Sequence, residues 1–111
     1  VDLVNYLGLE QHPDYHLCKK QMRHAGALMS FEVKGGFEAA KKFINQLSLC
    51  TSAVSLGTCD TLISHPASTT HVGVAPELRL KSGITDGLIR MSVGIEDVED
   101  ILGDLENALR L

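Results

Sequence analysis

The spacing of apolar residues predicts two amphipathic helices. Apolar side chains recur every three or four positions over residues 36–48 and again over residues 95–109. Each stripe is suited to cover a sheet on one side while polar residues face solvent on the other. Four acidic residues crowd the first half of the second helix, where they suit the helix dipole, and we expect them to form a solvated face. They are Glu96, Asp97, Glu99 and Asp100.

Shorter runs predict the strands and two further helices. β-branched and aromatic residues with partial alternation indicate strands. Pro13 and Pro76 stand where the first turn of a short helix would accept a proline. The expected strands cover residues 1–4, 28–33, 50–56, 61–64 and 88–93, the short helices cover 13–23 and 76–83, a turn covers 57–60, and 65–75 form a loop.

The order of these elements predicts a small α+β domain. Its sheet should be mostly antiparallel, with helices covering one face. The 111 residues correspond to one domain, and a hydrophobic content of 44% is sufficient for an aliphatic core. The first expected strand starts at Val1 with no Met before it. We therefore expect further sequence upstream of residue 1.

Charge and cysteine content narrow the function classes. The formal net charge of −4 argues against nucleic acid as the main partner, because phosphate binding needs a basic surface. No apolar run approaches the length of a membrane span. The three cysteines include no C-x-x-C pair, so no disulfide framework is indicated. A reducing compartment, the cytoplasm, is the expected location.

Three residue groups could carry chemistry, but each lacks a necessary part. A structural zinc site needs four closely spaced ligands. A cysteine nucleophile needs a base that a third group orients. A glycine pair before a helix can bind an anion, but a lone pair is weak evidence and a plain strand-to-helix turn explains it better. The groups are His12, His16 and Cys18 for a metal, Cys59 with His65 or His71 for a nucleophile, and Gly35–Gly36 for an anion.

Arg90 is the strongest single candidate, because it interrupts an otherwise apolar strand. Alternation places Arg90 and Ser92 on one face of residues 88–93, while the apolar residues Ile89 and Met91 face the other side. Two interpretations remain open at this point. Arg90 either lies at the surface or in a structural ion pair, or it forms a two-pronged clamp for a carboxylate.

Residues 88–97, Leu-Ile-Arg-Met-Ser-Val-Gly-Ile-Glu-Asp, resemble a signature of the cystathionine and methionine γ-lyase family. These are pyridoxal-phosphate enzymes of sulfur amino-acid metabolism and transsulfuration, and the signature belongs to their C-terminal domain. The resemblance extends in the right order over essentially the whole chain. The other similar segments are residues 8–13, 30–36, 53–57 and 65–71.

The resemblance implies a place in a larger enzyme. Residues 1–111 would be the small C-terminal domain of a type I pyridoxal-phosphate fold, with a large cofactor-binding domain missing upstream. Such enzymes are homotetramers with active sites at a subunit interface. The cofactor is bound through a lysine, and no lysine here lies in the Ser/Thr-rich stretch that the family uses. The chain alone is therefore expected to be inactive.

The resemblance also assigns substrate-binding roles. Arg90 matches the residue that grips the substrate α-carboxylate, Ser55 and Thr70 match residues that line the same pocket, and Leu56 would contribute through its backbone. Specificity is assigned to Val54 and Thr69. Cystathionine γ-lyases often carry an acid where Val54 stands, so the pattern favours methionine γ-lyase, although Thr69 replaces a common Met.

The expected reaction is α,γ-elimination from L-methionine or a related sulfur amino acid. Two kinds of alternative remain. The first is another activity of the same family, such as cystathionine γ-lyase, cystathionine γ-synthase or sulfhydrylation of an activated homoserine. The second is a non-catalytic stand-alone α+β module that packs against a partner chain. Fold alone does not distinguish these functions.

Overall fold

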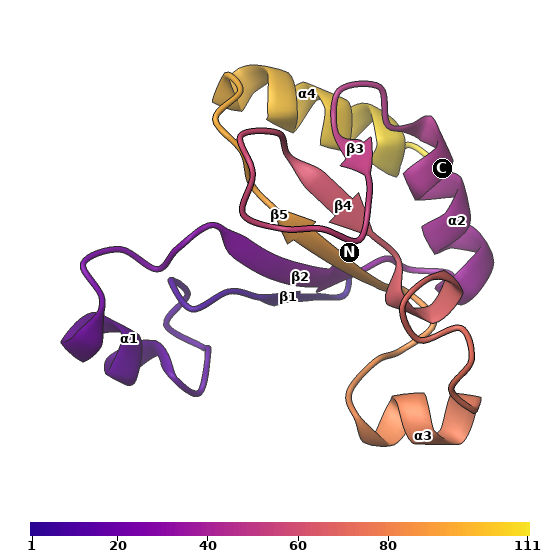
Figure 1. Ribbon diagram of the computed structural model, residues 1–111, viewed down its shortest axis with the longest axis horizontal. Coiled ribbons are helices and arrows are strands. Elements are labelled where there is room, and N and C mark those ends of the chain that lie inside the picture. Colours follow the sequence, from indigo (N-terminus) through magenta and orange to yellow (C-terminus); the bar gives the residue numbers. More distant parts are fainter.

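The computed structural model describes all residues 1–111 and contains one five-stranded sheet. The strand order is β1-β2-β5-β4-β3 (Figure 1). The strands are β1 (Leu3–Asn5), β2 (Leu28–Glu32), β3 (Thr51–Ser52), β4 (Leu62–Ser64) and β5 (Leu88–Ser92). The helices are α1 (Tyr15–Gln21), α2 (Gly36–Gln46), α3 (Pro76–Lys81) and α4 (Val98–Leu109), with a single 3₁₀ turn, η1 (Pro66–Ser68).

The sheet is mostly antiparallel, as the sequence predicts. Only β3 and β4 pair in parallel. The register aligns four polar residues in one row across β1, β2, β5 and β4. This row lies on the face away from the main core, and it consists of Asn5, Ser30, Arg90 and Ser64.

The core lies on the opposite face, under α2 and α4. Phe31, Ile89 and Met91 alternate with the polar row and are buried against these helices. Phe43 of α2 is 0% exposed, and its ring packs edge-on against Phe31 at a centroid distance of 5.7 Å. Burial of one such side chain stabilises the fold by roughly 1.5–3 kcal/mol. The prediction of helices covering one face is thereby confirmed.

Two helices lie outside this two-layer core (Figure 1). α1 belongs to an arm, residues 6–27, that projects from the end of the sheet. The Tyr6 hydroxyl closes its base by donating to the Gly26 carbonyl at 2.9 Å. α3 projects below the sheet between η1 and β5. No helix is long and apolar enough to cross a membrane.

Several predicted boundaries are wrong. The strand expected over residues 50–56 ends at Ser52, because the chain then leaves the sheet. The last helix begins at Val98 rather than residue 95, and Ile95 is 82% exposed. Asp97 starts the helix by accepting a hydrogen bond from the Glu99 amide at 2.8 Å. The expected loop over residues 65–75 contains η1, and the other elements differ by a few residues at their ends.

Glu96 does not belong to the solvated acidic face that the sequence indicates. Its carboxylate accepts hydrogen bonds from both the amide and the hydroxyl of Thr61, each at 2.7 Å. These bonds, the one from the amide first, lower the pKa of Glu96. Glu96 therefore ties the start of α4 to the start of β4.

Asp104 makes the second connection between α4 and the sheet. This side chain is buried and accepts hydrogen bonds from the amides of Ser48, Leu49 and Cys50 and from the Ser48 hydroxyl, at 2.7–3.0 Å. Burial raises the pKa of Asp104, but these bonds outweigh it and lower the pKa to about 2. Burial, followed by the nearby Asp104, raises the pKa of the Cys50 thiol to about 12. Cys50 is thus an inert core thiol.

Candidate functional site

The candidate site lies on the open face of the sheet, where the connection from β3 to β4 passes over β5. We call residues 53–60 the site loop. Because β3 and β4 are adjacent and parallel, the chain must travel back along the sheet between them. It does so without a helix, across the face opposite α2 and α4 (Figure 1). This return path is the reason why the predicted strand over residues 50–56 is cut short.

Arg90 stands in the middle of β5 and points to this loop. Its Nη2 atom donates hydrogen bonds to the carbonyls of Val54 at 2.8 Å and Ser55 at 2.9 Å. Its Nε atom is buried without a hydrogen-bond partner. No carboxylate lies within ion-pair distance of Arg90, so the structural ion pair considered from the sequence does not occur. The protein holds the guanidinium but leaves its charge without a counter-ion.

A cavity of about 230 Å³ adjoins Arg90 on the β1–β2 side. Three members of the polar row reach it, and the arm contributes the rest of its polar wall. Asn5 donates to the Ser30 hydroxyl at 3.3 Å within this row. The lining residues are Asn5, Leu7, His12, Leu28, Met29, Ser30 and Arg90. The cavity therefore has a mixed polar and apolar lining and contains one uncompensated cation.

The site loop is attached at two further points, one on β5 and one on the residues that follow it. The Gly57 amide donates to the Ser92 hydroxyl at 2.9 Å, and the Ile95 amide donates to the Cys59 carbonyl at 2.8 Å. Gly94 permits this close approach, because a Cβ there would lie 2.1 Å from the Cys59 carbonyl oxygen. The sequence pattern did not indicate this role of Gly94.

Three of the predicted site residues follow one another in the site loop. Arg90 holds the carbonyls of Val54 and Ser55, and Leu56 comes next. Val54 and Leu56 are each 54% exposed. They are large apolar groups left in contact with solvent, on a loop whose backbone is fixed.

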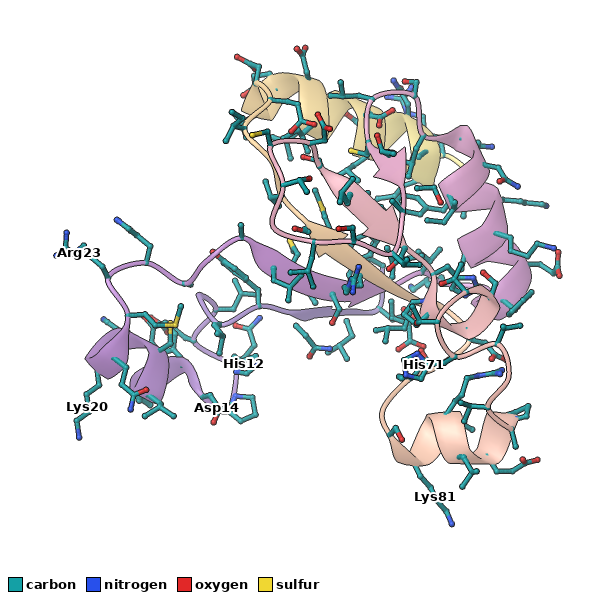
Figure 2. The ribbon with its side chains drawn as sticks, viewed as in Figure 1. His12, Asp14, Lys20, Arg23, His71 and Lys81 are labelled. Carbon is teal, nitrogen blue, oxygen red and sulfur yellow. The ribbon has the colours of Figure 1, made fainter.

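The two predicted threonines are not joined to Arg90 by hydrogen bonds. The Thr69 hydroxyl donates to the His65 carbonyl at 2.8 Å, and Thr70 pairs with His71 Nδ1 at 2.7 Å. Thr69 lines a separate hollow of about 160 Å³ beside α2. Figure 2 shows His71 where η1 leads toward α3, below the sheet. The structure of this chain therefore does not bring Thr69 and Thr70 together with Arg90 through hydrogen bonds.

Sequence reasoning missed the side chains that hold the segment between β4 and β5. His65 is 2% exposed, and its Nε2 atom donates to the Asp86 carbonyl at 2.7 Å. The buried Arg79 donates to the Val74 carbonyl at 2.9 Å and pairs with the Asp86 carboxylate at 3.1 Å. These residues are far apart in sequence and follow no period. No sequence signal indicated them, because the burial of Arg79 is evident only in the structure.

The other chemistry considered from the sequence is not assembled. Both nitrogens of His65 are engaged, by Ser68 and by the Asp86 carbonyl, so neither is available to activate Cys59. His71 is bonded to Thr70 instead. No three His, Cys, Asp or Glu side chains come together in a group that could hold a metal ion.

The lysines do not fit the covalent attachment of pyridoxal phosphate. Such a lysine is desolvated so that its amine can react near neutral pH. Every lysine of this chain is exposed, and Figure 2 shows Lys20 and Lys81 pointing away from the body of the molecule. The lysines are Lys19, Lys20, Lys34, Lys41, Lys42 and Lys81. None of these lysines has the desolvated environment that such an attachment requires.

Comparison with known proteins gives a consistent result. Residues 1–110 match the family described as Cys/Met metabolism PLP-dependent enzymes. An L-methionine gamma-lyase of Fusobacterium nucleatum is 59% identical over 98% of this chain. A cystathionine gamma-lyase of Saccharomyces cerevisiae is 49% identical over 96% of it. In each case the chain spans 28% of the relative's length.

Solved structures agree. A cystathionine gamma synthase from Xanthomonas oryzae pv. oryzae, in complex with aminoacrylate and cysteine, superposes with a TM-score of 0.90 at 46% identity. A gamma lyase from Micromonospora echinospora gives 0.92 at 42% identity. Both comparisons cover 98% of this chain and 28% of the solved one. The family match over nearly every residue, on the same fold, means that this chain belongs to the Cys/Met metabolism PLP-dependent enzymes.

Proposed function

We propose that this chain is the small, substrate-carboxylate-binding part of a longer pyridoxal-phosphate-dependent carbon–sulfur lyase. The substrate would be L-methionine or a related sulfur amino acid, cleaved by α,γ-elimination. The carrying observation is Arg90, which stands on the open face with a buried, unpartnered Nε and no counter-ion. An arginine cannot lose its proton in a protein, so this charge favours binding of an anion.

The α-carboxylate of an amino acid is an anion of suitable size. Arg90 Nη2 already donates to two carbonyls of the site loop, which fix the plane of the guanidinium. Nε is buried, so a carboxylate would meet the guanidinium through the remaining donor, Nη1. Ser55 and the backbone of Leu56 would line the same position. Thr70 would join them only when the complete active site is assembled.

Substrate choice is assigned to Val54 and Thr69. The exposed apolar side chain of Val54 suits a thioether end and disfavours a distal ammonium group, whose desolvation would cost affinity. This supports methionine over cystathionine. Thr69 would modify the preference from its position beside η1.

An apolar groove supports packing of this chain on the rest of the polypeptide. The groove of about 390 Å³ lies between α4 and strands β1, β2 and β5, and all of its lining residues are apolar. Apolar surface of this kind normally marks an interaction site. We assign it to the large domain of the longer polypeptide, because the chain spans only 28% of the length of its relatives. The whole enzyme would be a homotetramer.

The cofactor and the location follow from the same proposal. Pyridoxal phosphate would supply the electron sink for elimination, held by a lysine outside this chain. All three cysteines are free, which supports a reducing compartment, the cytoplasm.

The decisive experiment uses the full-length protein. Arg90→Ala should lower kcat/KM for L-methionine about 10- to 100-fold, the loss expected for one charge-assisted contact. Arg90→Lys should recover only part of the loss, because it keeps the charge without the planar fork. Arg23→Ala on the projecting arm is the matched control (Figure 2). If Arg90→Ala leaves the kinetics for L-methionine and L-cystathionine unchanged, the assignment is wrong.

Two alternative functions give different outcomes. Steady turnover of L-cystathionine, or its synthesis from an activated homoserine, in preference to L-methionine would identify a sister activity, as named for some relatives. An intact mass of the native polypeptide near 12.0 kDa would instead support a stand-alone module.

A further inference from the structure

Ser92 lies beneath the site loop and contacts its backbone. The residue is 3% exposed and stands two positions after Arg90 on the same face of β5. Its hydroxyl oxygen accepts the hydrogen bond from the Gly57 amide at 2.9 Å. Gly57 has a φ of +76°, a left-handed conformation that glycine adopts without strain. The contact therefore falls where the loop bends.

The attachments of the loop follow β5 and the residues just after it in order. Arg90 holds Val54 and Ser55, Ser92 holds Gly57, and the Ile95 amide holds Cys59. The loop thus runs alongside β5 and is fixed at each step. The first and middle contacts depend on a side chain of β5, whereas the last is made by backbone atoms alone. Without the Ser92 hydroxyl, the loop would be free between Ser55 and Cys59.

We propose that Ser92 is a positioning residue of the substrate site, an inference that rests on the function proposed above. Ser92 fixes the bend at Gly57, and this bend sets where the carbonyls of Val54 and Ser55 meet Arg90. Loss of the hydroxyl leaves the Gly57 amide without its partner and lets the loop shift. The guanidinium then loses its fixed plane. Binding of the substrate carboxylate weakens, while the chemical step on bound substrate is little affected.

The test uses the full-length enzyme with three variants. Ser92→Ala removes the hydroxyl, and Ser92→Thr retains it. Ser82→Ala is the matched control, because the Ser82 hydroxyl is exposed and bonds only to the Leu78 carbonyl within its own helix end. Ser92→Ala should raise KM for L-methionine about fivefold, the effect of one lost hydrogen bond, and change kcat less than about twofold. Ser92→Thr and Ser82→Ala should stay close to the parent enzyme.

A second readout does not depend on the substrate. Amide hydrogen exchange at Gly57 should become faster in Ser92→Ala than in the parent and in Ser92→Thr. Unchanged exchange at Gly57, or equal changes in Ser92→Ala and Ser82→Ala, would overturn the role of Ser92. Faster exchange with an unaltered KM would also overturn it, because the loop would then move without affecting the site.

The failure of this inference is separable from failure of the proposed function. If Arg90→Ala has no kinetic effect, the substrate site itself is wrongly placed, whatever Ser92 does to exchange. If Arg90→Ala is strongly impaired while Ser92→Ala is normal in both readouts, only the positioning role is wrong.

Discussion

The two faces of the sheet are covered in different ways. On one face, α2 and α4 pack apolar side chains against Phe31, Ile89 and Met91. On the other, the site loop is held to β5 by hydrogen bonds, mainly to the side chains of Arg90 and Ser92. The helical face is apolar throughout, including the groove beside α4, whereas the loop face leaves a hollow that contains the Arg90 charge and exposed apolar side chains.

This difference separates stability from recognition. Close packing of apolar residues contributes most of the free energy of folding and tolerates little change in volume. A loop held by a few polar contacts contributes less, but it presents backbone carbonyls and side chains in a defined arrangement. Substitutions on the helical face should therefore alter stability first, and those on the loop face should alter substrate binding first.

The largest stability loss is expected at the centre of the helical face. Phe43→Ala should lower the free energy of unfolding by about 3–5 kcal/mol, because it opens a cavity against Phe31. Chemical denaturation of the full-length protein measures the loss. Leu80→Ala, at an exposed position of α3, should change it by less than about 0.5 kcal/mol. Similar losses for both variants would contradict the assignment of the core.

The second-largest loss of stability is expected at Asp104, which connects α4 to the residues just before β3. Asp104→Asn should cost about 2–3 kcal/mol, because the amide cannot replace all the charge-assisted hydrogen bonds. Asp100→Asn in the exposed first turn of α4 is the control, expected to be nearly neutral.

Acidification tests the same group. The folded-state pKa of Asp104, about 2, lies below its ordinary value of 3.8, so its contribution is fully present above about pH 4 and is lost as pH falls toward 2. Denaturation curves should be measured between about pH 5 and about pH 2, a range that includes both pKa values. Over this range the free energy of unfolding should fall less in Asp104→Asn than in the parent. A parallel loss in both proteins would show that Asp104 is not the titrating group.

A smaller stability effect with a larger effect on binding is expected at Gly94. Gly94→Ala places a methyl group against the Cys59 carbonyl, which must push the loop outward. We expect about 1–2 kcal/mol of destabilisation, since the exposed loop can move, together with a higher KM for L-methionine. Gly103→Ala has open space in α4 and should be neutral or slightly stabilising. An unaltered KM in Gly94→Ala would show that the loop's position does not matter for binding.

The smallest stability effect, with a change of specificity, is expected at Val54. Val54→Glu lies at an exposed position and should change the free energy of unfolding by less than about 0.5 kcal/mol. The ratio of kcat/KM for L-cystathionine to that for L-methionine should rise about tenfold, because the acid can meet a distal ammonium group. Val72→Glu, also exposed, should leave the ratio unchanged. A constant ratio in Val54→Glu would remove Val54 from the specificity determinants.

Much of this architecture could be predicted from local pattern. The period of residues 36–46 and 98–109 is that of one-sided helices, and alternation in residues 88–92 placed Arg90 opposite the core. The length of β3 could not be predicted, because Ala53–Leu56 has strand-like composition but must leave the sheet to reach β4. The roles of Glu96 and Asp104 were missed for a related reason. Their partners are distant backbone amides, which carry no sequence signal.

The sequence by itself determined the helices, the two-sided character of β5 and the family resemblance, because these depend on residue type and short-range spacing. The tertiary structure alone decided that the loop after β3 returns over β5, that Arg90 meets two of its carbonyls, and that Ser92 holds its bend. Those contacts join residues about 35 positions apart through backbone atoms, which every residue possesses. Only the path of the chain selects which of them meet.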